Sequence, residues 1–290
     1  MKRFMSVFVI ALLSIALLAC GKKEFANDGT FLAFEESVHD GAAMLTWVEV
    51  VVEDGKIKSF NIDALQGKIE DGKHVWNEKS KKELAYDYRM HDPARSMSEE
   101  DYKAWLKDNN KLEWFEQANL IEEQFLANGV GSIDGITGVT IVDGGYSRLA
   151  AKAVENAKAG IYTAFEESVH DGAAMLTWVE ITVNSKGKIE SYNIDALQGK
   201  IEDGKHVWNE KSKKELAYDY RMHDPARSMS EADYKTWLKE NNKLEWFEQA
   251  NLIEAHFLAN KAGSIDGITG VTIVDGGYSS IAKAAEKFIK

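Results

Sequence analysis

One short stretch that combines hydroxyls, glycines and a carboxylate occurs twice, as Ser132–Thr140 and as Ser264–Thr272. Each copy reads Asp-Gly, an apolar residue, Thr-Gly, a second apolar residue and a final Thr. Glycine permits backbone conformations that a side chain forbids and lets a bulky group approach closely. The final hydroxyls, of Thr140 and Thr272, are therefore candidates to receive a group from another enzyme. The plainer interpretation is a turn that leads into a strand, because Asp-Gly mostly forms turns.

The pattern Asp-Gly-x-Thr-Gly-x-Thr resembles the flavinylation motif of the FMN-binding domain family. In that family a flavin transferase joins the phosphate of FMN to the last Thr or Ser through a phosphoester. The resemblance implies two covalent FMN groups, one on Thr140 and one on Thr272, although Val139 and Val271 stand where the family usually has Ala. The other motif residues implied in cofactor binding are Asp134, Gly135, Thr137, Gly138, Asp266, Gly267, Thr269 and Gly270.

A flavin ring would also need apolar and aromatic walls. The best candidates are Tyr88 and Met90, which recur as Tyr220 and Met222. Further candidates are Tyr86, Asn61 and Asp63 with their counterparts Tyr218, Asn193 and Asp195. All of these side chains could instead pack the core, and we assign Trp105, Trp114 and Phe115 to the core because of their helical spacing.

Several other chemistries find no support in the sequence. It contains no Gly-x-Ser-x-Gly for a serine hydrolase, no His-x-x-x-His for zinc, and neither a P-loop nor a Gly-x-Gly-x-x-Gly. We therefore expect no catalytic residue and no metal-binding residue. His39-Asp40 is interpreted as a polar turn. Arg89, His91 and Arg95 offer a thin basis for a reductase that acts on a small acceptor such as fumarate.

The composition is that of a globular protein of about two domains, with 290 residues, 44% of them hydrophobic. The formal net charge is -12, which argues against a nucleic-acid partner and against broad attraction to anionic lipid.

The amino terminus has the features of a targeting signal. Lys2 and Arg3 precede an apolar run, Phe4–Leu18, that is short for a membrane span. The following Leu17–Gly21 resembles a bacterial lipobox, which implies cleavage before Cys20 and a diacylglyceryl group on it. Cys20 is the single cysteine of the chain, so no disulfide can form within it. The alternative is an ordinary signal peptide with an incidental cysteine.

The rest of the chain is a tandem duplication. Asn61–Glu99 recurs unchanged as Asn193–Glu231, and a repeat of this length matches a whole domain. We expect a lipoprotein signal peptide at 1–19, a tether at 20–29, and FMN-binding domains at 30–158 and 159–290, each with its own core.

The expected order within the first copy is strands, then helices, then a strand and a helix. The strands are expected at Thr30–Ser37, Ala43–Val52, Lys56–Leu65 and Thr140–Val142; the helices are expected around Ser80–Leu84, after Ser98, at Leu112–Ala127 and at Ser147–Lys158. Pro93, with its counterpart Pro225, marks a break before the helices. This order predicts an α+β fold with a mainly antiparallel sheet and packed helices.

Taken together, the resemblances to the flavinylation motif and to the lipobox imply a lipid-anchored electron carrier on the extracytoplasmic face of the cell membrane. It is similar to the flavinylated lipoproteins of Gram-positive extracellular electron transfer. That similarity implies a flavin transferase for maturation, a membrane quinol or NADH-dependent electron donor, and an extracellular electron acceptor. The alternative is a lipid-anchored binding or surface-interaction protein without flavin.

Overall fold

The computed structural model describes residues 23–91, 96–223 and 228–290. The signal peptide, Cys20, Arg95, Pro93 and Pro225 lie outside the described residues. Within them the fold is α+β, as predicted, with two four-stranded antiparallel sheets.

Each repeat builds one sheet, whose strands follow one another in chain order. The first sheet consists of β1 (Gly29–His39), β2 (Ala42–Glu53), β3 (Lys56–Glu70) and β4 (Lys73–Trp76); the second consists of β5 (Ile161–His170), β6 (Ala173–Val183), β7 (Ile189–Glu202) and β8 (Lys205–Trp208). The first three strands of the first sheet confirm the sequence prediction, and β3 runs five residues beyond the expected Leu65.

The strand sequences alternate because one face of each sheet is covered by helices. On β2, Val48, Val50 and Val52 are fully buried, and the register places Val48 between Ala33 and Ile62 on the same face. Alternate positions of a strand point to opposite faces. The face that bears these valines therefore forms the helix-covered core of the first repeat.

The helices follow the strands in both repeats. The first repeat has α1 (Lys81–Leu84), η1 (Ala85–Asp87), α2 (Glu99–Asp108), α3 (Trp114–Asn128) and α4 (Tyr146–Ala159); the second has α5 (Lys213–Leu216), η3 (Ala217–Asp219), α6 (Glu231–Glu240), α7 (Trp246–Asn260) and α8 (Tyr278–Phe288). Ser98 caps α2 as predicted, since its side chain accepts from the Asp101 N–H. The α3 helix packs on β3, and α4 packs on β1 and β2.

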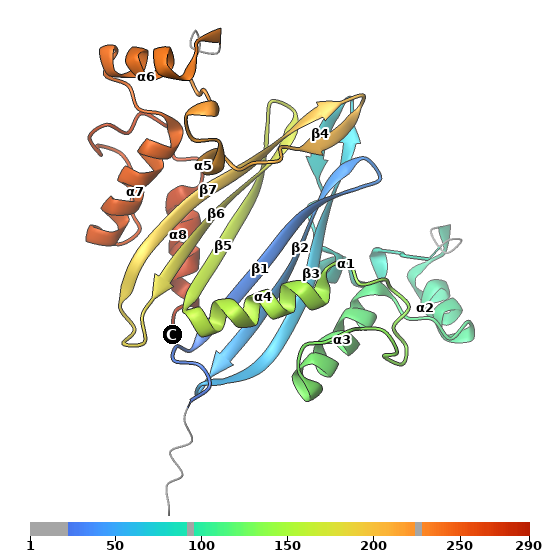
Figure 1. Cartoon of the computed structure of the whole chain (residues 1–290). Helices are drawn as coiled ribbons and strands as arrows, with labels where there is room; N and C mark the ends of the chain where they lie inside the picture. The colour runs from blue at the N-terminus through green and yellow to red at the C-terminus, as the bar shows by residue number, and fades with distance from the viewer. Residues whose placement is uncertain (1–22, 92–95, 224–227) are drawn as a thin grey trace, which may run out of the picture.

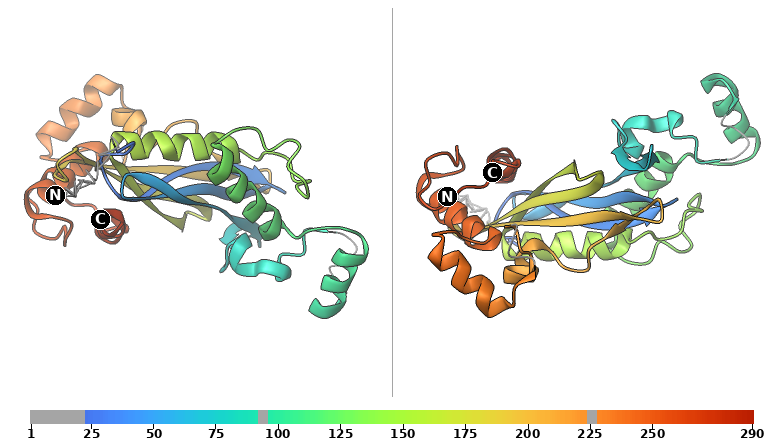
Figure 2. Two further views of the ribbon diagram at one scale, coloured as in Figure 1. Left: turned by 90° about the horizontal axis from the view of Figure 1, so that it is seen from below. Right: turned by 90° about the horizontal axis from the view of Figure 1, so that it is seen from above.

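The two repeats pack closely against each other. Strands β1 and β5 lie side by side at the centre, with α1–α3 and α5–α7 on opposite sides of the molecule (Figure 1; Figure 2). Phe31 packs against Tyr162 with ring centroids 4.4 Å apart and the rings tilted by 31°. The indole of Trp76 donates to the carbonyl of Ser168 at 3.0 Å, and Trp208 donates in the same way to Ser37. The buried core is continuous from one repeat to the other.

The described part of the expected tether lies against the first repeat. Phe25 is fully buried, and the backbone N–H groups of Glu24 and Phe25 donate to the carbonyl of Gly55 in the turn between β2 and β3. The carboxylate of Asp28 accepts from the N–H of Gly55 at 2.8 Å. These contacts fix where the chain leaves the folded part toward its amino terminus.

Candidate functional site

The motif lies in a loop that joins α3 to α4; we call residues 129–145 the first acceptor loop and residues 261–277 the second. Two tight turns follow one another in the first loop, at Asp134–Gly135 and Thr137–Gly138. Their glycines have φ angles of 83° and 91°, which side chains rarely adopt. A Cβ on the second glycine would also approach two leucine side chains to 3.1 Å. The loop conformation therefore requires the glycines of the motif.

Gln117, which is fully buried on α3, holds the acceptor end of this loop. Its side-chain oxygen accepts from the N–H of Thr140 at 2.7 Å and from that of Ile141 at 3.0 Å, and it lies 3.3 Å from Thr140 Oγ1. Because an amide oxygen can only accept, the hydroxyl donates to it and leaves its own lone pairs unused. Thr140 is exposed, so the site presents a hydroxyl on a fixed backbone.

The expected strand at Thr140–Val142 is wrong. The segment is irregular, because the first two N–H groups bond the Gln117 side chain where a neighbouring strand would be needed. Val142 is 87% exposed and provides no apolar packing that could hold a strand there.

The structure places Met90 against Gln117, which binds the first acceptor loop, and places Tyr88 against Trp114 at the start of the same helix. The Sδ atom of Met90 lies 3.5 Å from the Nε2 of Gln117, whose oxygen contacts Thr140. Tyr88 packs edge-on against Trp114, with ring centroids 6.4 Å apart. Both candidate wall residues are half-buried, so each keeps some surface that a flavin ring could contact.

Lys81 is a site residue that sequence reasoning missed. It is buried, and its ammonium lies 4.9 Å from the ring centre of Tyr88 and 5.3 Å from that of Trp114. Burial lowers the pKa of Lys81 to about 8, although the charge of Asp63 acts in the opposite direction. Lysine in the first turn of a short helix gives no sequence signal for such a position, because it is ordinarily exposed.

Glu113 is a second buried residue that the sequence did not single out. Its carboxylate accepts from the hydroxyl of Tyr102, from the N–H of Met90 at 3.2 Å and from the N–H of Trp114 at 2.7 Å. The side chain is fully buried, and burial together with this carboxylate raises the pKa of Tyr102. Glu113 therefore fixes the segment that carries Met90 to the start of α3. The capping box that it forms with Glu116 gave no sequence signal, because the recognisable form of this motif begins with Ser or Thr.

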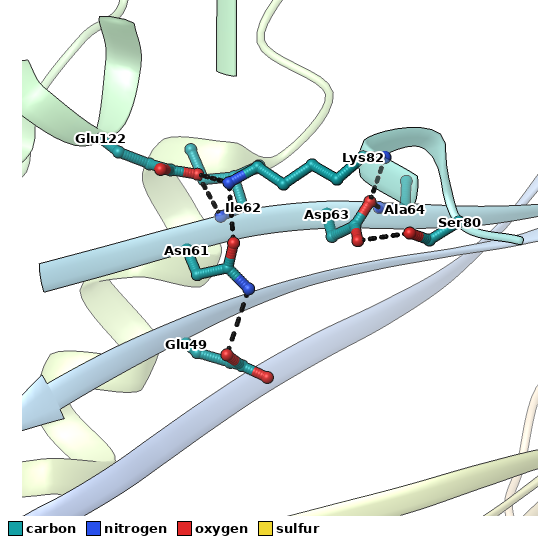
Figure 3. Close-up of polar contacts among 8 residues, drawn as sticks. All are labelled: Glu49, Asn61, Ile62, Asp63, Ala64, Ser80, Lys82 and Glu122. Atoms are coloured by element: carbon teal, nitrogen blue, oxygen red, sulfur yellow. Dashed lines mark hydrogen bonds and ion pairs between the residues drawn. The ribbon is translucent and has the colours of Figure 1, made fainter. Parts of the chain in front are cut away.

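Asn61 and Asp63, which we considered for polar flavin contacts, lie in a separate network that anchors α1 to the sheet (Figure 3). Asp63 accepts from the Ser80 hydroxyl at 2.6 Å, and Lys82 donates to Asn61 at 2.7 Å and to Glu122 at 2.5 Å. Burial raises the pKa values of Asp63 and Glu122. These bonds hold α1, α3 and β3 together and occupy the polar atoms of both residues.

The second repeat reproduces this arrangement. Gln249 is fully buried, and its oxygen accepts from the Thr272 N–H at 2.7 Å and lies 3.3 Å from the hydroxyl. Met222 contacts its Nε2 at 3.5 Å. Lys213 lies over the rings of Tyr220 and Trp246, and burial lowers its pKa to about 8.

A cavity large enough for a small molecule lies beside the first acceptor loop. A cavity of about 530 Å³ lies between α3 and the first acceptor loop, with Leu120, Ile136 and Thr137 among its walls. Cavities that bind small molecules are usually of about 300–1,000 Å³. Gly135 faces open space, since a Cβ there would meet nothing within 4 Å. Thr140, Tyr88 and Met90 do not line this cavity, so the open volume lies beside the Asp-Gly and Thr-Gly turns of the motif and not at the Thr140 hydroxyl itself.

Other site chemistries remain without support in the described residues. No group of three or more His, Cys, Asp or Glu side chains there could hold a metal ion. Arg89, a candidate for binding a small anionic acceptor, stacks its guanidinium over Tyr102 and donates to the carbonyl of Met97 at 2.7 Å. His91 bonds the carbonyl of Leu112 through its Nε2 atom. Both side chains therefore have structural partners.

Comparison of the chain with protein-family models, with curated proteins and with solved structures finds no match. Among the helices that the structure describes, none has the length and apolar character needed to cross a membrane.

Proposed function

We propose that this protein is a lipid-anchored, extracytoplasmic electron carrier with two FMN groups, attached through phosphoesters to Thr140 and Thr272. Cys20 carries the lipid. A flavin transferase loads the two sites from a flavin dinucleotide: each threonine oxygen bonds to the FMN phosphorus as the diphosphate bond breaks, and the other nucleotide leaves with the threonine proton. A membrane quinol or an NADH-dependent system supplies electrons, and an extracellular acceptor receives them. A bound flavin would supply transfer of one or two electrons, while the protein supplies attachment, orientation and electrostatics.

The observation that carries the proposal is the presentation of two equivalent hydroxyls. Each acceptor Thr is exposed, and each donates to a fully buried glutamine that also binds the two backbone N–H groups at that point. An acceptor in covalent modification needs an accessible oxygen whose lone pairs face outward. A purely structural Thr-Gly turn would not need a buried amide to fix the hydroxyl that follows it.

The residues around the acceptor have distinct roles in this proposal. Met90 and Tyr88 provide a wall for the ring, and Gln117 fixes the direction in which the attached group leaves the loop. Lys81 places a positive charge behind that wall, where it would favour the negative charge that a reduced flavin ring carries. Its surroundings lower its pKa to about 8, so it is mainly charged at neutral pH.

The test is the mass of the protein after co-expression with a flavin transferase. Two FMN increments are expected, with one lost in Thr140→Ala, one in Thr272→Ala and both in the double variant. Thr137→Ala, which changes the earlier hydroxyl of the first motif, serves as the matched control and should keep both. Absence of flavin from the unsubstituted protein would overturn the proposed function, and flavin retained by the double variant would move the attachment sites.

The second candidate is a lipid-anchored surface-interaction protein without flavin. The close packing of the two repeats favours this candidate, because two sheets that are held against each other offer a single scaffold for binding a partner. Visible absorbance separates the two candidates, because only the flavoprotein is yellow.

A further inference from the structure

A cavity lined by lysines lies beside the Thr-Gly turn of the second acceptor loop. It has a volume of about 510 Å³ and is bounded by α6, by the segment that follows α6 and by the turn Thr269–Gly270. Its positively charged walls are Lys235, Lys239 and Lys243. We call this space the lysine cavity.

The charge of the lysine cavity is positive. The one carboxylate among its walls, that of Glu248, is already bonded, since it accepts from the Tyr218 hydroxyl at 3.0 Å and from the Glu245 N–H at 2.8 Å. Lys235 pairs with Glu231 at 2.5 Å. Lys239 and Lys243 are exposed and take part in none of the ion pairs found among the described residues. Two unpaired ammonium groups thus face a cavity on a chain of net charge -12.

The first repeat has the same residues at these positions, Lys103, Lys107 and Lys111. The position of the first of these lysines is also the same in both repeats. The ammonium of Lys103 lies 4.4 Å from the ring centre of Tyr86, and that of Lys235 lies 4.4 Å from the ring centre of Tyr218. Three other positions on these helices differ between the repeats, Glu100, Ala104 and Asp108, which become Ala232, Thr236 and Glu240. The lysines are therefore common to both sites although the helices that carry them have diverged.

The cavity wall lies two residues along the chain from the acceptor. Gly270 forms part of its wall, and Thr272 follows two residues later, a separation of at most about 7 Å along an extended chain. A lysine side chain is long and flexible, and its ammonium binds a phosphate as a point charge. A phosphate on the Thr272 hydroxyl would therefore lie within reach of Lys239 and Lys243.

We propose that the lysine cavity of the second repeat, and the equivalent lysines of the first repeat, bind the phosphate of the flavin nucleotide, both as the nucleotide approaches the acceptor Thr and after it is attached. This inference rests on the proposed function and extends it from the acceptor hydroxyl to the residues that recognise the charged end of the nucleotide. Lys107 and Lys111 serve Thr140, and Lys239 and Lys243 serve Thr272.

Binding to the protein made without transferase tests the cavity directly. FMN and riboflavin share the same ring and differ in the phosphate, so each is titrated against the protein while flavin fluorescence is followed. FMN should bind about tenfold more tightly than riboflavin, as for a hydrogen bond to a charged group, and added salt should reduce the difference. Lys107→Gln/Lys111→Gln/Lys239→Gln/Lys243→Gln should abolish it, and the matched Arg variant should keep it. Equal binding of the two flavins, or a preference that survives the Gln changes, overturns the proposal.

Attachment provides a second readout with a control inside the same molecule. Lys107→Gln/Lys111→Gln should slow the loading of Thr140, while Thr272 in the unchanged repeat loads as before. Peptide masses report the two sites separately. Equal loading of both sites in this variant would overturn the role of the lysines and leave the proposed function intact. Absence of flavin from both sites of the unsubstituted protein would overturn the proposed function. The titration of FMN and riboflavin would still test the phosphate preference independently of that result.

Discussion

The Oε1 atom of Gln117 lies 2.7 Å from the backbone nitrogen of Thr140 and 3.3 Å from its hydroxyl oxygen. One buried side chain therefore fixes both the backbone and the hydroxyl of the residue that we propose as a flavin acceptor. The amide nitrogen of Gln117 is bonded to the carbonyl of Leu112 at 3.0 Å, which sets the orientation of the amide and leaves its oxygen facing the loop.

Replacing Gln117 should therefore impair the first acceptor site and leave the second unchanged. Gln117→Leu leaves the N–H groups of Thr140 and Ile141 without their partner, a loss of about 1–3 kcal/mol for each group that stays buried. We expect reduced loading of Thr140 and normal loading of Thr272, measured by peptide mass. The double variant Gln117→Leu/Gln249→Leu should impair both sites. Equal loading of both sites in the single variant would show that the glutamine does not position the acceptor.

Tyr102→Phe should destabilise the protein by removing one donor to a buried carboxylate. The hydroxyl of Tyr102 donates to Glu113, and both residues are fully buried, so the change should lower the free energy of unfolding by about 1–3 kcal/mol. Tyr86→Phe is the matched control, because Tyr86 donates to Glu116 at 3.0 Å but is only half-buried. Urea unfolding of the two variants gives the comparison, and an equal effect of both changes would contradict the role assigned to Glu113.

The sequence alone was sufficient to predict the strands and helices that have a regular residue pattern. Alternation along β1–β3 and the cap at Ser98 predicted strands and a helix close to their observed bounds. The strand expected at Thr140–Val142 failed for a physical reason, because short apolar runs do not reveal whether their N–H groups will meet a strand or a side chain such as Gln117.

The conformation of the candidate acceptor loop was predictable in part. The Thr-Gly pattern identified the loop, since its glycines are required by the φ angles of that loop. The residues that support it, Gln117, Glu113 and Lys81, could not be identified, because polar residues on a helix are usually exposed and only packing against a distant segment buries them.

Stability should fall in mild acid because of His74 and His206. Their rings lie 5.4 Å apart between the repeats and both are buried, and within the part of the chain that the structure describes their ring nitrogens have no hydrogen-bond partner. Burial, aided for His74 by the charge of His206, lowers each pKa to about 4, whereas an unfolded histidine titrates near 6.5. The unfolded chain therefore binds more protons between these values, and the free energy of unfolding decreases as the pH falls from about 6.5 to about 4, by up to about 3 kcal/mol per histidine.

Urea unfolding across this pH range measures the effect. His74→Leu/His206→Leu should flatten the dependence of stability on pH, whatever the variant loses in stability at neutral pH. His39→Leu/His170→Leu is the control, because these two histidines are exposed and the change should leave the slope in place. A slope that is unchanged in the His74 and His206 variant would show that other groups cause the acid sensitivity.

Finally, the first repeat should fold as a fragment of residues 23–160 but be less stable than the full chain. The fragment keeps its sheet and the helices that cover it, so we expect one cooperative transition in urea. It loses the packing of Phe31 against Tyr162 and the bond from Trp76 to Ser168, and exposing one large aromatic side chain costs about 1.5–3 kcal/mol. Adding a fragment of residues 161–290 should raise the urea midpoint by restoring these contacts. A first fragment that shows no cooperative transition would mean that the core, which continues across the repeats, cannot form in one of them alone.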